Sequence, residues 1–293
     1  MNDEKVSVVI TTKNRLSLLK RAVESVYGQT YNNLELIVVD DASEDGTLQW
    51  AEKQNFKYIY IEKEDSHGGN YARNLGIKNT TGEYVAFLDD DDYWESDKLK
   101  KQVDLLIEKK CGMVYCGRRV EYIDSHGTNL DTVWLPNINN QGDVHRRILY
   151  EIMCSTSTIL VKRSLLFEIG LFDENLRFWQ EYELDIRLAQ ITEFYFVNEP
   201  LCIYRLDKTD KNRLSNKYHE WEKAVNYIYS KHSKLYSRQS IIERYLKKIL
   251  YLGDAVNRTV SDDLRIIHAA IYIRWWIMIF PYRIIHKIQK SVR

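Results

Sequence analysis

The first 110 residues alternate between two hydrophobic periods, and this alternation constrains the fold more than any other feature. Residues 5–14 (KVSVVITTKN) form a β-branched run typical of a buried strand, whereas residues 15–30 carry apolar side chains at helical spacing. Strands that alternate with helices predict an α/β fold with a Rossmann-like, mainly parallel sheet flanked by helices. The other strand-like runs lie at 34–43, 57–64 and 83–94, and the other helix-forming stretches lie from residue 47 and within 67–82.

The rest of the chain is less regular. Residues 112–124 indicate a further strand pair, and residues 193–205 return to a strand pattern after an acid-rich stretch. A helical pattern runs from about residue 216 to 252. We therefore expect one α/β domain over 1–210, with halves at 1–110 and 111–210, followed by a helical C-terminal region over 211–293.

The net charge of zero hides an uneven distribution. Residues 201–293 contain 19 Lys or Arg against 8 Asp or Glu, so the first 200 residues are net acidic. No recognised nucleic-acid motif accompanies the basic part, and we expect no nucleic-acid partner. The four cysteines are scattered in apolar contexts, which favours reduced thiols and a cytoplasmic location. The first residues lack the basic start and apolar stretch of a signal peptide.

Polar side chains follow three of the predicted strands where each strand ends. Thr11 and Thr12 end the first, Asp40 and Asp41 end the second, and four aspartates, 89–92, end the fourth. Ligands of open α/β sheets bind outside the carboxyl ends of the strands. Each cluster alone is also typical of turns and helix caps. Three clusters on one edge indicate a binding site.

The octapeptide FLDDDDYW, residues 87–94, points to a cation. Adjacent carboxylates repel, so four in a row at a strand end need a positive partner. Magnesium prefers oxygen ligands and is held by one or two carboxylates plus substrate phosphates. The pattern predicts a divalent cation that neutralises a departing diphosphate. A solvated acidic turn or an incidental calcium site is the alternative.

Five segments, taken in order, resemble family 2 glycosyltransferases with the GT-A fold. The resemblance covers about residues 5–205 and implies inverting transfer of a sugar from a nucleotide diphosphate donor, usually UDP, with Mg²⁺ or Mn²⁺. It makes 1–110 the nucleotide-binding half and 111–210 the acceptor-binding half. The segments are VSVVITTKNR, ELIVVDDASEDGT, NYARNLGI, GEYVAFLDDDDYW and QEYELDIRLA.

The resemblance also implies roles for residues of the acidic cluster. The family's Asp-x-Asp signature falls on Asp89 and Asp91, and Asp91 is the predicted metal ligand. Asp89 or Asp90 is expected to bind the ribose. Four consecutive aspartates leave open which of Asp89, Asp90 and Asp91 contacts the metal.

Three further donor contacts are implied by position. Thr11 and Asp41 are expected to contact the uracil, and Arg73 to support the base or the diphosphate. Residues 204–215 resemble a loop that closes over the diphosphate, with Arg205, Lys208 and Lys211 as phosphate contacts; an ordinary solvated loop is the alternative.

An inverting transfer needs a general base for the acceptor hydroxyl. The family places a carboxylate before an apolar helix, and Glu181 takes that position here, although Asp is commoner in the family. Either acid can be tuned by burial. Glu183 and Asp185 are competing candidates. Trp179 and Tyr182 flank the base and either stack on an acceptor sugar or pack in the core.

The C-terminal stretch 264–293 contains six Lys or Arg, two tryptophans and no acidic residue. Its apolar runs are too short to span a bilayer, and Arg274 and Pro281 interrupt them. Basic residues beside tryptophan predict an amphipathic helix at a membrane surface. A homo-oligomer interface and packing on the catalytic domain are the alternatives.

These features predict a metal-dependent hexosyltransferase that moves a sugar from a UDP-sugar to a glycan or lipid-linked oligosaccharide. Such an enzyme fits bacterial capsule or polysaccharide synthesis on the inner face of the cell membrane. A sugar nucleotidyltransferase is one alternative, but it usually needs a Gly-rich basic loop after the first strand, where this chain has TTKNRLSLL. A catalytically inactive binding module is the other.

Overall fold

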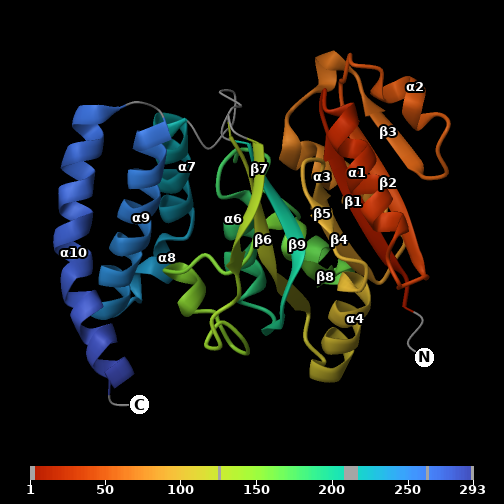
Figure 1. Ribbon diagram of the computed structural model, residues 1–293. Helices are drawn as coiled ribbons and strands as arrows, with labels where there is room; N and C mark the ends of the chain where they lie inside the picture. The colour runs from red at the N-terminus through yellow and green to blue at the C-terminus, as the bar shows by residue number, and fades with distance from the viewer. Residues whose placement is uncertain (1–3, 125–126, 208–216, 262–263, 292–293) are drawn as a thin grey trace. The chain divides into compact units, whose positions relative to one another are not determined.

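The computed structural model describes residues 4–124, 127–207, 217–261 and 264–291, and they fold into two compact units (Figure 1). The first unit comprises 1–145 and 153–209. The second comprises 146–152 and 210–293. The short segment 146–152 therefore groups with the C-terminal helices, which the sequence pattern did not indicate.

A nine-stranded mixed sheet forms the centre of the first unit, in the order β3-β2-β1-β4-β8-β6-β9-β5, with β7 paired to β6. Strands β1 to β4 pair in parallel, as predicted, whereas β4–β8, β6–β8, β6–β7 and β5–β9 are antiparallel. The strands are β1 Val6–Thr12, β2 Leu34–Asp41, β3 Lys57–Ile61, β4 Tyr84–Asp89, β5 Tyr93–Trp94, β6 Met113–Asp124, β7 Gly127–Trp134, β8 Leu160–Lys162 and β9 Phe194–Asp207.

Helices cover both faces of this sheet because its strands are apolar on both sides. Leu19 and Val23 of α1 and Val103 of α4 join the core on one face, together with Val38 of β2. Ala72 of α3 packs on the other face. The helices of this unit are α1 Leu16–Tyr27, α2 Thr47–Ala51, α3 Gly69–Lys78, α4 Lys98–Lys109, α5 Arg163–Glu168 and α6 Gln180–Leu188, with short 3₁₀ turns at Lys63–Asp65 and Thr156–Thr158.

A glycine sets how closely α3 approaches the sheet. A Cβ on Gly76 would overlap the side chain of Val9 in β1. Only glycine therefore lets α3 lie this close to the sheet. The close approach brings the polar residues of the first turns of α3 to the carboxyl ends of β1 and β4.

The second unit is helical, as predicted for the C-terminal region. Trp221 is fully buried and stacks on Tyr251, with ring centroids 5.2 Å apart. The Tyr245 hydroxyl donates to the carbonyl of Met278, which ties α9 to α10. The helices are α7 Tyr218–Lys231, α8 Ser233–Ser237, α9 Ile241–Ser261 and α10 Arg265–Ser291, with a 3₁₀ turn at Arg147–Leu149.

Candidate active site

The sheet register brings the three predicted polar clusters to one edge. Thr11 lies opposite Asp89 across the β1–β4 pair, and Thr12 lies opposite Asp40 across the β1–β2 pair. All three strands run in the same direction, so their carboxyl ends meet at this edge. The strand-end side chains therefore form one polar rim.

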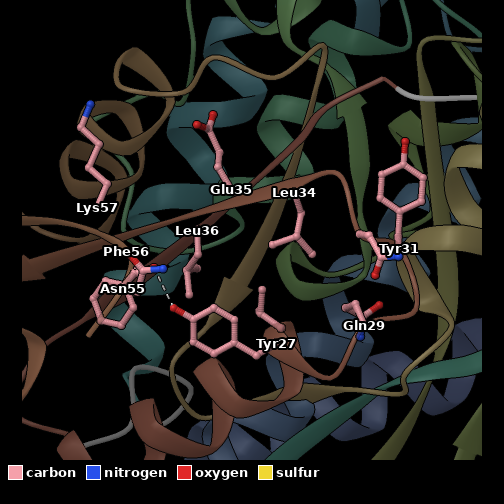
Figure 2. A pocket seen from close by; sticks show the side chains of 11 residues that line it. Tyr27, Gln29, Tyr31, Leu34, Glu35, Leu36, Asn55, Phe56 and Lys57 are labelled. Carbon is pink, nitrogen blue, oxygen red and sulfur yellow. Dashed lines mark hydrogen bonds between the residues drawn. The ribbon is translucent and has the colours of Figure 1, made fainter. Parts of the chain in front are cut away.

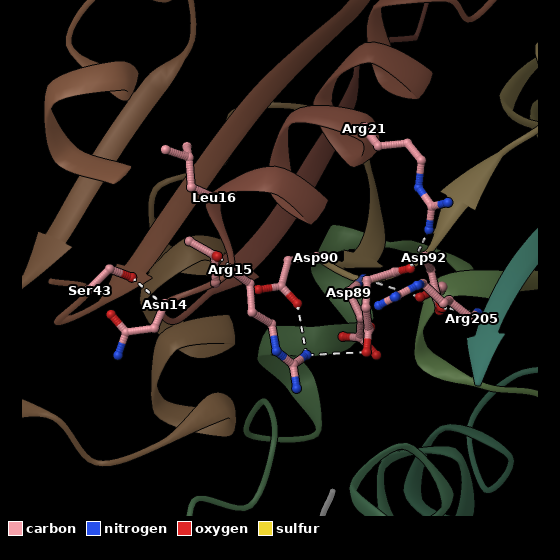
Figure 3. Close-up of polar contacts among 12 residues, drawn as sticks. Asn14, Arg15, Leu16, Arg21, Ser43, Asp89, Asp90, Asp92 and Arg205 are labelled. Carbon is pink, nitrogen blue, oxygen red and sulfur yellow. Dashed lines mark hydrogen bonds and ion pairs between the residues drawn. The ribbon is translucent and has the colours of Figure 1, made fainter. Parts of the chain in front are cut away.

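Arg15 neutralises the middle of the acidic cluster. Its Nη1 lies 3.2 Å from Asp90 Oδ1 and 3.1 Å from Asp91 Oδ2, as Figure 3 shows. Arg21 adds a hydrogen bond to the backbone carbonyl of Asp91, at 3.1 Å. Neither arginine was predicted from the sequence to belong to the site. Arg15 follows β1 and Arg21 lies in α1, and this closeness to a strand end was the one feature of the sequence that could have placed them near the site.

The four aspartates occupy different environments. Asp90 and Asp92 are buried, whereas the side chains of Asp89 and Asp91 are 32% and 25% exposed. Burial raises the pKa of Asp90 to about 6, against the opposing charge of Arg15. Burial and the charge of Asp91 also raise the pKa of Asp92, whose Oδ1 accepts the backbone N–H of Arg205 at 3.0 Å. Asp89 and Asp91, the first and third of the four, are therefore the accessible carboxylates.

Asp40 and Asp41 are both buried but differ in their hydrogen-bond partners. Asp40 is fully buried and accepts hydrogen bonds from the Tyr58 hydroxyl, at 2.7 Å, and from the Ser43 N–H. Asp41 pairs with Lys13 through Oδ2, at 3.3 Å, while its buried Oδ1 has no hydrogen-bond partner. A buried acceptor without a donor is costly, so Asp41 is suited to receive an N–H from a ligand.

Backbone strain follows the same rim. Asn14 after β1, Ala42 after β2 and Trp179 before α6 have φ of 54°, 62° and 51°. Such left-handed conformations cost on the order of 1–3 kcal/mol each in non-glycine residues and cluster at functional sites. The Asn14 N–H donates to Ser43 Oγ at 2.7 Å, which joins the first two loops (Figure 3).

Arg73 connects the rim to α6. Its Nη2 lies 2.6 Å from Asp89 Oδ1, and its Nη1 donates to Gln180 Oε1 at 2.6 Å. The guanidinium is largely buried, with its Cζ 5.7 Å from the centre of the Phe172 ring. One side chain thus holds the start of α6 beside the end of β4. Its predicted contact with the nucleotide stays a prediction.

The three acids of α6 are separated by their partners. Both oxygens of the buried Glu183 accept from Arg187, the shortest contact being 2.6 Å, so this carboxylate is committed to an ion pair. Asp185 is buried, and the Cys154 thiol donates to its Oδ2 at 3.0 Å. Burial raises the pKa of Asp185 to about 8. Neither competing candidate faces solvent as a free carboxylate.

Glu181 is partly exposed and, within the described residues, forms no ion pair. Burial raises its pKa, and the Asp89 carboxylate acts in the same direction, whereas Arg73 and Arg118 lower it. A raised carboxyl pKa brings a general base closer to neutral pH. Of the three acids, Glu181 therefore has the exposure and environment that a base needs.

The residues predicted to contact the acceptor or the diphosphate lie in different surroundings. Trp179 is buried and contacts Tyr182 edge to face, with ring centroids 5.1 Å apart, and Tyr182 is 1% exposed. Their burial favours core packing, and contact with an acceptor sugar stays a prediction. Arg205 pairs with Asp207 at 3.1 Å. Lys208 and Lys211, the other predicted loop contacts, lie outside the described residues.

The rim fits a metal held mainly by its substrate. Within the described ranges, no three His, Cys, Asp or Glu side chains gather into a metal site. Asp91 and Asp89 are accessible carboxylates that already attract two arginines. Such a pair suits Mg²⁺ or Mn²⁺ whose remaining ligands are diphosphate oxygens and water.

A hollow of about 540 Å³ lies away from this rim. Figure 2 shows it lined by Leu34 and Leu36 from the start of β2 and by Lys57 from the start of β3. Tyr27 closes one side through a 3.0 Å hydrogen bond to the Asn55 carbonyl. The hollow is therefore at the amino ends of the strands, opposite the polar rim, and we assign it no role.

The raised pKa of Asp185 predicts a pH-dependent stability. Its ordinary pKa is 3.8 and its folded value about 8, so between these limits the folded chain keeps a proton that the unfolded chain releases. The free energy of unfolding should fall as pH rises, by at most about 1.4 kcal/mol per pH unit from this group. In urea unfolding, the free energy of unfolding should fall less between pH 5 and pH 8 in Asp185→Asn than in the wild type.

The exposed Asp104 on α4 supplies the control for this prediction. Asp104→Asn should keep the pH dependence of the wild type. An Asp185→Asn variant with the same pH dependence as the wild type would show that Asp185 is ionised in the folded protein.

Comparisons with known proteins agree with this geometry. The family model described as glycosyl transferase family 2 matches residues 7–170. An uncharacterized glycosyltransferase of Rickettsia typhi is 32% identical over 220 residues, which are 74% of this chain and 69% of that protein. TuaG of Bacillus subtilis, provisionally named a teichuronic acid biosynthesis glycosyltransferase, is 32% identical over 69% of this chain and 79% of its own length.

A third relative is similar over a shorter stretch. WfaP of Escherichia coli is named a UDP-Glc:α-D-GlcNAc-diphosphoundecaprenol β-1,3-glucosyltransferase. It is 35% identical over 119 residues, which are 40% of this chain and 47% of WfaP.

Two solved structures share the fold at low sequence identity. Staphylococcus aureus TarS, residues 1–349 in complex with UDP-GlcNAc, is 18% identical with a TM-score of 0.58, over 95% of this chain and 91% of that one. The mannosyltransferase PcManGT of Pyrobaculum calidifontis, with GDP-Man and Mn²⁺, is 19% identical with a TM-score of 0.62, over 99% and 85%. These matches confirm the predicted GT-A fold, and the matching model and relatives show that the chain is a glycosyltransferase of family 2.

Proposed function

We propose that this glycosyltransferase transfers a sugar with inversion from a UDP-sugar to a hydroxyl of a glycan or lipid-linked oligosaccharide. The observation that carries the proposal is the arrangement of α6. Arg73 holds Glu181 next to the end of β4, while Glu183 and Asp185 are occupied by Arg187 and Cys154. A single available base beside a diphosphate site is what an inverting displacement requires.

The proposed chemistry assigns each group one task. Thr11 and the unpaired Oδ1 of Asp41 bind the base of the nucleotide. Asp89 or Asp90 positions the ribose, and Asp91 would hold Mg²⁺ or Mn²⁺. When bound, the metal neutralises the charge that develops on the leaving diphosphate.

Glu181 removes the proton from the acceptor hydroxyl while the hydroxyl oxygen attacks the anomeric carbon of the donor sugar. The bond from that carbon to the diphosphate breaks on the opposite face, and UDP leaves. The raised pKa of Glu181 makes its carboxylate a stronger base for this proton than an exposed glutamate would be.

The relatives support the choice of substrate class. WfaP is named for a UDP-glucose donor and an acceptor linked to diphosphoundecaprenol, and TuaG for teichuronic acid synthesis. TarS has been solved with UDP and with UDP-GlcNAc. PcManGT contains GDP-Man and Mn²⁺, so a guanosine donor is the main alternative for the nucleotide.

A lipid-linked acceptor is consistent with the exposed face of α10. Ile266, Ile273 and Ile277 are 87%, 58% and 63% exposed, and Trp276 lies beside them. Their spacing of seven and four places them on one stripe of the helix. Arg274 is exposed next to this stripe. No helix in the described parts of the chain is both long and apolar enough to cross a bilayer. We propose that this stripe rests on an anionic membrane surface.

UDP binding tests the donor site. We expect Mn²⁺ to strengthen UDP binding by the wild type at least tenfold, because Asp91 would hold a metal that offsets the charge of the diphosphate. Asp91→Ala should remove this enhancement in a calorimetric titration with and without Mn²⁺, whereas Asp104→Ala should keep it. If the wild type binds GDP but not UDP, the donor is a GDP-sugar rather than a UDP-sugar. If it binds neither, the proposal is contradicted.

Replacement of Glu181 tests the base. Glu181→Gln keeps the size of the side chain and should lower kcat by about 10²–10⁴-fold with UDP affinity unchanged. Release of UDP from UDP-sugars in the presence of acceptor measures this, with Glu168→Gln, an exposed acid of α5, as the control. Near-normal turnover would assign the base to another residue, and release of pyrophosphate would indicate a nucleotidyltransferase.

Vesicle binding tests the α10 stripe. The wild type should co-sediment with vesicles of equal parts phosphatidylglycerol and phosphatidylcholine and bind phosphatidylcholine alone more weakly. Replacing both Ile273 and Ile277 by Asp should reduce this binding about tenfold or more, whereas Ile138→Asp, an exposed residue of the first unit, should not. Unchanged sedimentation would contradict the membrane proposal. A shift from dimer to monomer in light scattering would instead assign the stripe to self-association.

A further inference from the structure

Arg118 of β6 is a cation without a counterion. None of the carboxylates that the structure describes pairs with it, and its Nε is buried without a hydrogen-bond partner. A buried donor left unpaired costs on the order of 1–3 kcal/mol. Such a cost needs a compensating interaction, and nothing in the proposed donor site uses this arginine.

Two aromatic rings hold the guanidinium. Its Cζ lies 5.3 Å from the ring centre of Trp134 and 5.1 Å from that of Tyr204. Trp134 in β7 is directly opposite Arg118, and Tyr204 in β9 is opposite Val120, two residues along the same strand. All three side chains are partly exposed. Cation–π contacts orient the guanidinium but leave its N–H groups available for a planar oxyanion.

The sheet order places this group beyond the donor strands. The nucleotide rim is built on β2, β1 and β4, whereas Arg118 lies on β6, which β8 separates from β4. Glu181 senses both Asp89 at the end of β4, which raises its pKa, and Arg118 on β6, which lowers it. In an inverting transfer the acceptor hydroxyl lies between the base and the anomeric carbon, on the face opposite the leaving diphosphate. A cation that acts on the base from a strand outside the nucleotide strands is therefore on the side of the acceptor.

We infer that Arg118, Trp134 and Tyr204 form an acceptor subsite that binds a sugar carrying an oxyanion, either a carboxylate or a phosphate. The aromatic rings provide faces for the sugar ring, and the arginine fork matches two oxygens of the anion. The inference rests on the proposed transferase function and adds the chemical class of the acceptor.

Three matched sugars test the subsite on the full-length protein saturated with UDP and Mg²⁺, so that the donor site is filled. The probes are D-glucose, D-glucuronate and D-glucose 6-phosphate, which differ mainly in charge. Ligand-observed NMR titration should show one anionic sugar binding at least tenfold more tightly than glucose. Preference for glucuronate identifies a carboxylate, and preference for glucose 6-phosphate identifies a phosphate.

Substitution of Arg118 then assigns the preference. Arg118→Gln should abolish it, and Arg118→Lys should keep only part of it, because lysine retains the charge but not the planar fork. Arg119→Gln, the adjacent arginine on the same strand, should behave as the wild type. Unchanged UDP affinity and thermal unfolding would show that each variant is folded; if Arg118→Gln does not fold, Arg118→Lys carries the test.

Several results would overturn the inference. Equal binding of the three sugars by the wild type would show that no anion subsite exists, and a preference that survives in Arg118→Gln and Arg118→Lys would place it elsewhere. Loss of UDP binding in a folded Arg118 variant would move the arginine to the donor site. A shifted pH profile of turnover with unchanged sugar binding would limit Arg118 to tuning Glu181. Failure of the wild type to bind UDP is a separate result, which contradicts the proposed function instead.

Discussion

The contact of Arg73 with Asp89 and Gln180 is the constraint on which the site depends. Helix α6, which carries the proposed base, and strand β4 are far apart in sequence. The Arg73 guanidinium joins their ends through two 2.6 Å contacts. Its position depends in turn on Gly76, which lets α3 lie against β1. A catalytic carboxylate must be held within a fraction of an ångström of its working position. The Arg73 contacts supply that restraint without using the base itself.

The acidic rim carries its own cations. Arg15 pairs with Asp90 and Asp91, Arg73 with Asp89, and Lys13 with Asp41. These pairs offset the repulsion among neighbouring carboxylates in the absence of a substrate. If Asp91 holds a metal as proposed, Arg15 would have to give up its ion pair with Asp91. Binding at this rim would then exchange ion pairs rather than neutralise a bare charge cluster.

The sequence predicted the parts of the molecule that local patterns determine. Strands β1, β2 and β4 are largely buried on both faces, so their apolar runs are distinctive, and parallel pairing brings Thr11, Asp41 and Asp89 to one edge. The antiparallel contacts were not predictable in this way, because β5 pairs with β9 over a separation of more than 100 residues. The partners of Arg15 and Arg118 were missed for the same reason. Arginine in a strand such as CGRRVEY is a signal of a buried charge, but the sequence does not show what faces it.

The partners of the three acids of α6 distinguish the proposed base from its two neighbours. Glu181 and Asp185 are four residues apart and thus neighbours on the helix surface. If both were ionised, each would raise the pKa of the other, and a proton would settle on the pair near neutral pH. Burial keeps the proton on Asp185, whose pKa is about 8, although the hydrogen bond from the Cys154 thiol acts in the opposite direction. Glu183 is neutralised by Arg187. Among the acids of this helix, Glu181 is then the one that has neither an ion-pair partner among the described residues nor a hydrogen bond from a thiol, and this is why we propose it as the base.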